Sequence, residues 1–385
     1  MAKSKKNAYR SLIVWMLVLL VLAALACAGY IMTTKALKDR QAEHEQLVAD
    51  VNAQLTAEYN AAVAETKRQE ASQLATETSW PEAKKTGWDV VDLSNFSVKK
   101  GKDVTVTRRD MLGGGLLLIN RWHLMPSDLL DEYMVSVNQH SRADNDKTNN
   151  LPTTNAAISM QPAAVEALMR MYSDARAAGL DMDNIIIDEG YRSMQEQSEK
   201  WNDTVSELSS RYSGNTLTEK ARVSTAYPGS SDYQSGLSMF LYNYKSSDKE
   251  FTNTPLHETE QGKWIYNNGW KYGFVFRFPV AGFPYADSVD KSYKTGINLS
   301  NNKVYRYVGE ANATAMNILG FCLEEYVEYL MEHPHIAIYN NGQLKYEIYR
   351  TTGGYGNMNV NIPNGASSYT VSADNMDGVV VSIHY

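Results

Sequence analysis

The N-terminus carries a long run of apolar residues, and this run limits where such a chain can reside. Residues 12–32, LIVWMLVLLVLAALACAGYIM, contain no charged side chain. As a helix they would extend about 30 Å, the thickness of a bilayer core. The segment before them, MAKSKKNAYR, is basic and has no acid. This asymmetry predicts a cytoplasmic basic tail at 1–10 and an extracellular main domain.

We therefore expect an uncleaved transmembrane signal anchor at 11–32 in a single-pass protein of the cell membrane. A cleaved signal peptide would have a shorter apolar core. Lipoprotein processing at Cys27 is the alternative that the sequence leaves open.

Residues 33–78 contain no Gly or Pro and are rich in Ala, Glu, Gln, Lys and Leu, a composition typical of helices. Val48, Val51, Leu55 and Ala62 follow a helical spacing, which Glu58 interrupts. We predict a helical stalk, either a lone solvated helix or a dimeric coiled coil that would make the protein a homodimer. Pro81 ends the stalk, and 79–102 are expected to form a linker.

Charge and cysteine content exclude two classes of protein. The net charge is -7 at pH 7, which argues against a nucleic-acid partner. The two cysteines, Cys27 and Cys322, lie in very different segments. We therefore expect no disulfide framework.

Strand and helix patterns alternate irregularly over 103–332, which favours an α+β domain, an antiparallel sheet flanked by helices. Residues 113–125 resemble a glycine turn that leads into a buried strand, and 183–197 a strand, a turn and a helix. Residues 161–180 and 312–331 are expected to be amphipathic helices. In 333–385, Asn-Gly and Asp-Gly pairs separate β-rich runs, which predicts hairpins. These strands form either a small C-terminal β appendage or an extension of the main sheet.

Four segments of the domain carry recognisable motifs: GYRSMQEQ (190–197), YPGSSDYQSGLSMF (227–240), WIYNNGWKYGFVFRFP (264–279) and NNKVYRYVG (301–309). In this order they resemble the VanY-type D-alanyl-D-alanine carboxypeptidases, zinc peptidases that trim the stem peptide of peptidoglycan. The resemblance covers about 110–331. It implies the fold of that family, a bacterial cell envelope and a zinc cofactor.

The residues that the family uses for catalysis are replaced in this chain. The resemblance places the first histidine ligand at Tyr233, the aspartate ligand at Phe240 and the second histidine ligand at Val304. The glutamate that acts as general base corresponds to Asn301. Catalytic zinc needs three protein ligands and an open position for water, so we expect no zinc here. A relocated site would have to use Asp232, His123, His140 or His257, which show no ligand spacing.

Other residues of the family pattern are retained. Arg192 stands where the family's arginine meets the substrate's carbonyl or carboxylate, and an arginine fork suits either group. Ser231, Gln197 and Tyr233 are the further candidates for ligand binding. Gln234, Gly236, Trp264, Tyr272, Arg306 and Tyr307 are also retained. Alternatively, all of these residues are retained because the fold requires them.

Three functions follow as hypotheses. The first is a membrane-anchored, catalytically inactive pseudo-peptidase that binds a peptidoglycan stem peptide or an envelope protein. The second is an active D-Ala-D-Ala carboxypeptidase or other metallopeptidase with relocated ligands. The third is a structural interaction module in the extracellular space, in which Tyr233 and Phe240 plug the family's substrate cleft.

Overall fold

The computed structural model describes residues 20–22, 32, 34–35, 38–39, 87–143 and 146–385. The chain divides into two compact units, 1–68 and 69–385, and the fold described below is that of 87–385. Nearly all of the expected anchor and stalk lie outside the described residues, as does Cys27. Within the described ranges, no helix is long and apolar enough to cross a membrane.

A four-stranded antiparallel sheet forms the centre of the domain. Its order is β5 (Ile185–Glu189), β6 (Ser238–Asn243), β8 (Val304–Tyr307) and β7 (Phe274–Phe276). Alternate residues such as Ile187, Met239 and Tyr305 face one hydrophobic core, as the period of a strand requires. The predicted helix at 161–180 is α4 (Pro162–Ala177), whose Leu168 and Met171 are buried in the same core.

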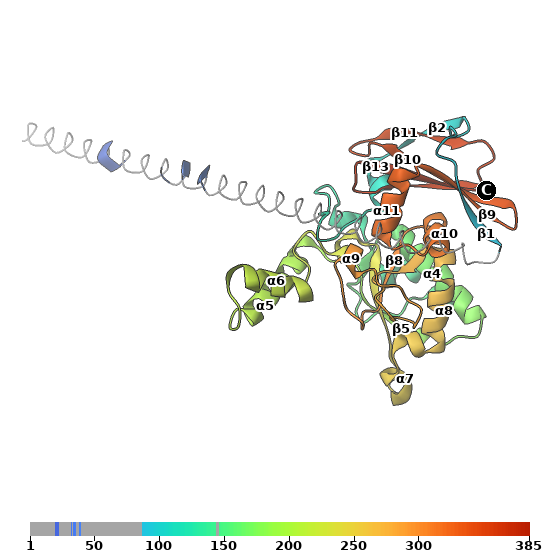
Figure 1. The fold of residues 1–385 in the computed structure, drawn as a ribbon. Coiled ribbons are helices and arrows are strands. Elements are labelled where there is room, and N and C mark those ends of the chain that lie inside the picture. Colours follow the sequence, from blue (N-terminus) through green and yellow to red (C-terminus); the bar gives the residue numbers. More distant parts are fainter. Residues whose placement is uncertain (1–19, 23–31, 33, 36–37, 40–86, 144–145) are drawn as a thin grey trace, which may run out of the picture. The chain divides into compact units, whose positions relative to one another are not determined.

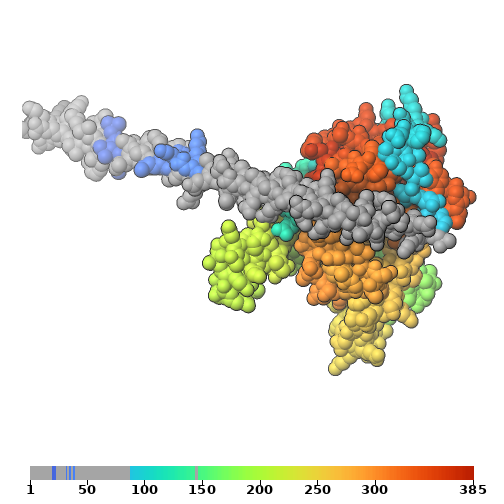
Figure 2. All heavy atoms as spheres, viewed as in Figure 1, coloured from blue at the N-terminus to red at the C-terminus, as the bar shows by residue number. Residues whose placement is uncertain are grey.

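Shorter elements precede these strands or connect them. A small pair, β3 (Val135–Ser136) and β4 (Ser159–Met160), lies before α4. Between β5 and β6, α5 (Met194–Leu208) and α6 (Gly214–Ser224) form a helical pair that projects from the domain (Figures 1 and 2). The remaining short helices are α2 (Arg108–Leu112), α3 (Val137–Ser141), α7 (Lys249–Asn253), α8 (Glu260–Asn268) and α9 (Ser292–Thr295).

The expected single helix at 312–331 is two helices, so that prediction is wrong. Helix α10 (Glu310–Leu319) ends at Gly320, whose φ is 71°. Glycine adopts this left-handed conformation at little cost and commonly terminates helices. Helix α11 (Leu323–Glu332) then begins after Cys322, which is buried and has a free thiol.

The C-terminal strands form a sheet of their own and do not extend the central one. The order is β1 (Trp88–Asp92), β9 (His335–Asn340), β10 (Gln343–Thr352), β13 (Gly378–His384) and β12 (Ser368–Ala373). A separate pair joins β2 (Gly101–Val106) to β11 (Met358–Pro363). The predicted Asn-Gly hairpin is confirmed between β9 and β10, and the Asp-Gly pair lies between β12 and β13.

Part of the expected linker belongs to this sheet, because β1 pairs with β9 along its length (Figure 1). The sheet also shares a hydrophobic core with the helices that follow the central sheet. Ile338, Ile348 and Val380 pack in one cluster with Tyr326 and Leu330 of α11. The C-terminal strands are therefore part of the packed domain.

The predicted buried strand within 113–125 is also corrected. Residues 115–120 are buried, whereas Leu124 is exposed, and the segment forms no strand ladder. The Leu116 N–H donates to Ser372 Oγ at 2.8 Å, and the Gly115 and Leu117 carbonyls accept from the Arg306 guanidinium at 3.1 and 2.8 Å. Gly115 has φ of 116°, and a Cβ there would lie 2.6 Å from the Val308 carbonyl carbon. This close approach explains why glycine is required at 115.

Candidate ligand-binding site

Arg192 lies in the turn between β5 and α5, and its guanidinium is held from two sides. Nη2 donates to Glu189 Oε2 at 2.5 Å, and Nη1 donates to Gln197 Oε1 at 2.7 Å. Gln197 in turn donates to the Ala226 carbonyl at 2.6 Å. The Arg192 side chain is only 13% exposed. These contacts fix the direction in which the guanidinium points.

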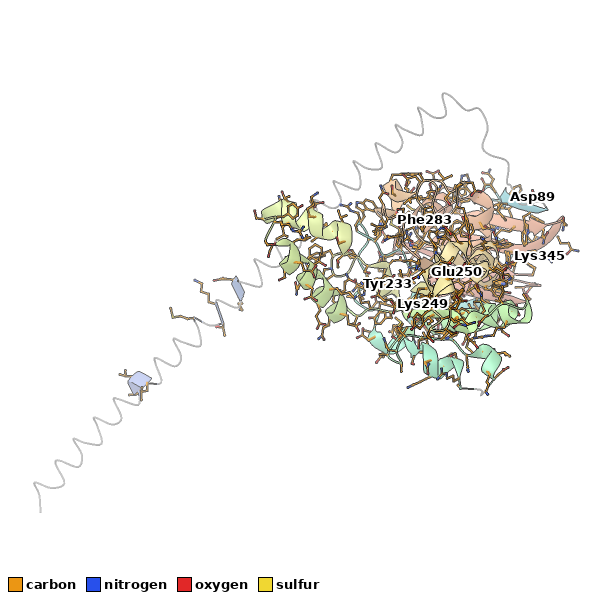
Figure 3. All side chains as sticks on the ribbon, turned by 90° about the horizontal axis from the view of Figure 1, so that it is seen from below. Asp89, Tyr233, Lys249, Glu250, Phe283 and Lys345 are labelled. Carbon is orange, nitrogen blue, oxygen red and sulfur yellow. The ribbon has the colours of Figure 1, made fainter. Side chains whose placement is uncertain are left out.

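Tyr233 covers one face of this guanidinium. The Arg192 Cζ lies 4.7 Å from the centre of the Tyr233 ring, a cation–π geometry. The Arg192 N–H also donates to the Tyr233 carbonyl at 3.3 Å. Figure 3 shows Tyr233 at the side of the domain near the projecting helical pair. Burial raises the pKa of the Tyr233 phenol far above its usual value, and the negative charge of Glu189 adds to this effect.

The 3-10 turn that carries Tyr233 (Asp232–Ser235) is anchored by a buried carboxylate. Asp232 accepts from Arg306 Nη1 at 2.7 Å and from the Ser238 hydroxyl, and it lies 3.2 Å from Arg277 Nε. Arg277 also pairs with both oxygens of Glu324 at 2.9 and 2.7 Å. Burial alone would raise the pKa of Asp232, but the two guanidinium charges outweigh it and hold the pKa below its usual value.

Three further residues shape this turn. The Ser231 N–H donates to Gln234 Oε1 at 3.3 Å, and the Gln234 N–H donates to the Ser231 carbonyl at 2.9 Å. Both side chains are buried. Gly236 ends the turn with φ of 70°. A Cβ at Gly236 would lie 2.4 Å from Met134 Sδ, so no larger residue fits without a shift.

The strand register brings the other replaced positions together. Phe240 on β6 is directly opposite Val304 on β8, and on its other side it is opposite Glu189 on β5. Val304 is 6% exposed and Phe240 is half-buried. Asn301 lies exposed in the turn before β8.

The side chains at these positions do not fit zinc. Phe240 and Val304 have no lone pair to donate. Tyr233 would bind zinc only as a phenolate, and its raised pKa disfavours the loss of the proton. Among the residues that the structure describes, no group of three or more His, Cys, Asp or Glu could hold a metal ion.

The histidines that could have formed a relocated site lie on different elements. His123 is hydrogen-bonded to Asn120 at 3.0 Å, and His140 lies 3.9 Å from Glu166. His257 packs edge-on against the Phe283 and Tyr285 rings. Asp232 is engaged by two arginines, as described above, and is therefore not available as a ligand.

Glu189 is the residue of this site that sequence reasoning missed. Its second oxygen, Oε1, lies 3.1 Å from Lys200 Nζ on α5. An acid three residues before Arg192 is visible in the sequence, but at the end of a strand this spacing does not predict a contact. The partners of Arg277 were also missed, because Glu324 lies far along the chain.

Comparisons with known proteins show which proteins this chain resembles. Residues 157–290 match the family VanY, D-alanyl-D-alanine carboxypeptidase. A D-alanyl-D-alanine carboxypeptidase of Enterococcus faecium is 30% identical over 285 residues, which cover 73% of this chain and 79% of the relative. A D-alanyl-D-alanine carboxypeptidase of Enterococcus faecalis is 27% identical over 215 residues, covering 55% and 65% of the two chains.

Among solved structures, the fold is similar to that of the vancomycin resistance D,D-dipeptidase VanXYg in complex with a D-Ala-D-Ala phosphinate analog. The TM-score is 0.54 at 22% identity, and the match covers 74% of this chain and 99% of that chain. The sequence match to the Enterococcus faecium enzyme, the family match and this shared fold lead to one conclusion. The chain belongs to the VanY-type D-alanyl-D-alanine carboxypeptidase family.

Proposed function

We propose that this protein is a catalytically inactive member of its family that binds a peptidoglycan stem peptide at the bacterial cell surface. The observation that carries the proposal is the set of side chains at the family's zinc positions. Tyr233, Phe240 and Val304 stand at the motif positions where the resemblance puts the ligands, and none is a ready metal donor.

The missing chemistry cannot be supplied by one compensating residue. In a zinc peptidase the metal polarises the scissile carbonyl and lowers the pKa of the attacking water, and a carboxylate accepts the proton. Here Asn301 replaces that carboxylate and cannot accept a proton at neutral pH. The apolar pair Phe240 and Val304 fills space that unliganded polar groups would otherwise occupy, at a cost of about 1–3 kcal/mol for each unsatisfied group.

Binding is supported by the residues that remain. The Arg192 guanidinium is oriented by Glu189, Gln197 and the Tyr233 ring before any ligand arrives. A fixed donor loses little conformational entropy when a peptide carbonyl binds. The related VanXYg was solved with a D-Ala-D-Ala phosphinate analog, and we extend a peptide ligand of this kind to the present chain.

The location is also part of the proposal. The uncharged run at 11–32 and its basic flank support a single membrane anchor with the family domain outside the cell. A helical stalk at 33–78 would hold the domain away from the membrane and, as a coiled coil, would pair two chains.

The test is a combined assay of metal content, turnover and binding on the purified full chain. We expect no stoichiometric zinc by elemental analysis and no release of D-alanine from a D-Ala-D-Ala peptide. Calorimetric titration of such a peptide should show binding that weakens in Arg192→Gln. D-alanine release that stops with a chelator and returns with zinc would overturn inactivity, and absence of peptide binding would favour a purely structural role.

A further inference from the structure

The Arg192 guanidinium already has an acidic partner within the chain. Glu189 is the last residue of β5, and its Oε2 accepts from Arg192 Nη2 at 2.5 Å. Its other oxygen lies 3.1 Å from Lys200 Nζ. Each carboxylate oxygen of Glu189 therefore lies next to a positively charged side chain.

This pair is partly shielded from water. The Arg192 side chain is 13% exposed and that of Glu189 is 32% exposed. Burial alone would raise the pKa of Glu189, but Arg192 and Lys200 outweigh it and lower the pKa below its usual value. Glu189 is thus ionised at neutral pH, and the pair is stronger than a fully solvated one.

Part of the hydrogen-bonding capacity of Arg192 is already used within the chain, so a second carboxylate would compete with Glu189. A ligand carboxylate pairs best with an arginine through two parallel N–H bonds. Nη1 already donates to Gln197 and Nη2 to Glu189, while the Tyr233 ring covers one face.

Charge acts in the same direction. The Glu189 carboxylate already lies against the Arg192 guanidinium, at the place where a ligand would meet it. A further negative charge would be repelled by Glu189, which already partly offsets the charges of Arg192 and Lys200. A neutral amide carbonyl needs a single N–H and adds no charge.

We propose that Glu189 is a built-in counter-ion of Arg192 and selects ligands that present an amide carbonyl, not a free carboxylate, to this arginine. The inference rests on the proposed function and names its ligand class. The ligand is a D-alanine-containing peptide whose terminal carbonyl is part of an amide, as in a peptide joined to another chain.

The experiment compares two probes on the full chain by calorimetry. One is diacetyl-L-Lys-D-Ala-D-Ala with a free carboxylate, and the other is the same peptide with a C-terminal amide. The wild type should bind the amide about ten-fold more tightly or better, the scale of one charge-assisted hydrogen bond. In Glu189→Gln, which keeps the size and one acceptor oxygen, the preference should reverse in favour of the carboxylate.

Glu199→Gln is the matched control. Glu199 lies on α5, next to Lys200, and accepts a hydrogen bond from Gln195 at 2.9 Å. Its substitution removes the same charge from the same region of the chain, and it should leave the wild-type preference unchanged. Circular dichroism of each variant checks that the fold is intact.

The outcomes separate the two proposals. Equal affinity of the wild type for both probes, or an unchanged preference in Glu189→Gln, would overturn the role of Glu189 while peptide binding stands. Weaker binding of both probes in Glu189→Gln would make Glu189 a positioning residue and would also overturn the inference. If neither the wild type nor Glu189→Gln bound either probe, both the proposed function and the inference about Glu189 would be overturned.

Discussion

Tyr233 stands where the resemblance expects a histidine ligand, and its ring instead lies over the Arg192 guanidinium. The Tyr233 side chain thus has a structural role of its own at Arg192. At the same scale, Phe240 and Val304 pair across neighbouring strands as ordinary apolar residues do. Single residues therefore decide the chemistry available at the site, while the backbone that carries them keeps the family's fold.

If those side chains alone prevent zinc binding, then restoring them should restore the metal. We expect the variant Tyr233→His, Phe240→Asp, Val304→His and Asn301→Glu to take up about one zinc per chain, measured by elemental analysis. The control carries only Asn301→Glu, which replaces the base but no ligand, and should contain no zinc. A folded four-residue variant without zinc would show that the strands no longer place these positions within coordinating distance.

Asp232 is the residue whose loss should damage the fold most. It is 7% exposed and faces Arg306 and Arg277, so Asp232→Asn leaves two buried guanidinium groups undercompensated. We expect a loss of about 3–5 kcal/mol in the free energy of unfolding by urea. Asp183→Asn removes a carboxylate that pairs with Arg176 but is 80% exposed, and it should cost at most about 1 kcal/mol. Similar losses in both variants would contradict this role for Asp232.

At the scale of elements, β9 is connected to the segment after β1 through a buried histidine. His335 Nδ1 lies 2.9 Å from the Phe96 carbonyl oxygen, and Nε2 lies 2.8 Å from Glu347 Oε1. Tyr385 donates to the other oxygen of Glu347 at 2.6 Å. Because a carbonyl and a carboxylate are both acceptors, this site favours a ring that carries both protons.

This arrangement predicts a pH dependence of stability. Burial alone would lower the pKa of His335, but the Glu347 and Phe96 bonds raise it above its ordinary value of 6.5. The stabilisation is therefore complete below pH 6.5 and is lost as the pH rises through the folded pKa. Glu347, whose pKa is lowered mainly by the His335 bond, gives the opposite trend at acidic pH, where protonation removes its contribution.

The measurement is the free energy of unfolding from pH 6 to pH 9 in wild type and His335→Gln. The wild type should lose stability relative to the variant across this range. The difference between the two proteins isolates His335 from His123 and His384, whose pKa values burial lowers. Lys99, which also acts on Glu347, is unchanged in both. Parallel curves of the free energy of unfolding against pH in the two proteins would rule out a stabilising role for protonated His335.

At the scale of the whole molecule, the C-terminal sheet is expected to fold with the family domain as one unit. Val380 of β13 and Ile348 of β10 share a core with α10 and α11, and residues 69–385 form one compact unit. A chain ending at Asn364, which lacks β12 and β13, should lose its cooperative thermal transition, followed by circular dichroism. Removal of 1–68 should preserve that transition. A truncated chain that still unfolds cooperatively would make the sheet an independent appendage.

Much of the site and fold could be predicted from local patterns. The position of Arg192, the replaced residues Tyr233, Phe240 and Val304, and the hairpin at Asn341-Gly342 all depend on residues close together in the sequence. The pairing of β1 with β9 could not be predicted, because its partners are more than two hundred residues apart. The α10–α11 break was missed because one glycine in an apolar pattern does not reveal its backbone conformation.

The sequence by itself determined the family, and it predicted the replacement of the zinc donors and a ligand-binding role for Arg192, since each depends on residue identity at motif positions. Only the tertiary structure decided that Arg192 is already paired with Glu189, that Tyr233 covers it, and that Asp232 is enclosed by two arginines. The physical reason is that charge pairing and burial depend on distances between elements, which no local pattern specifies.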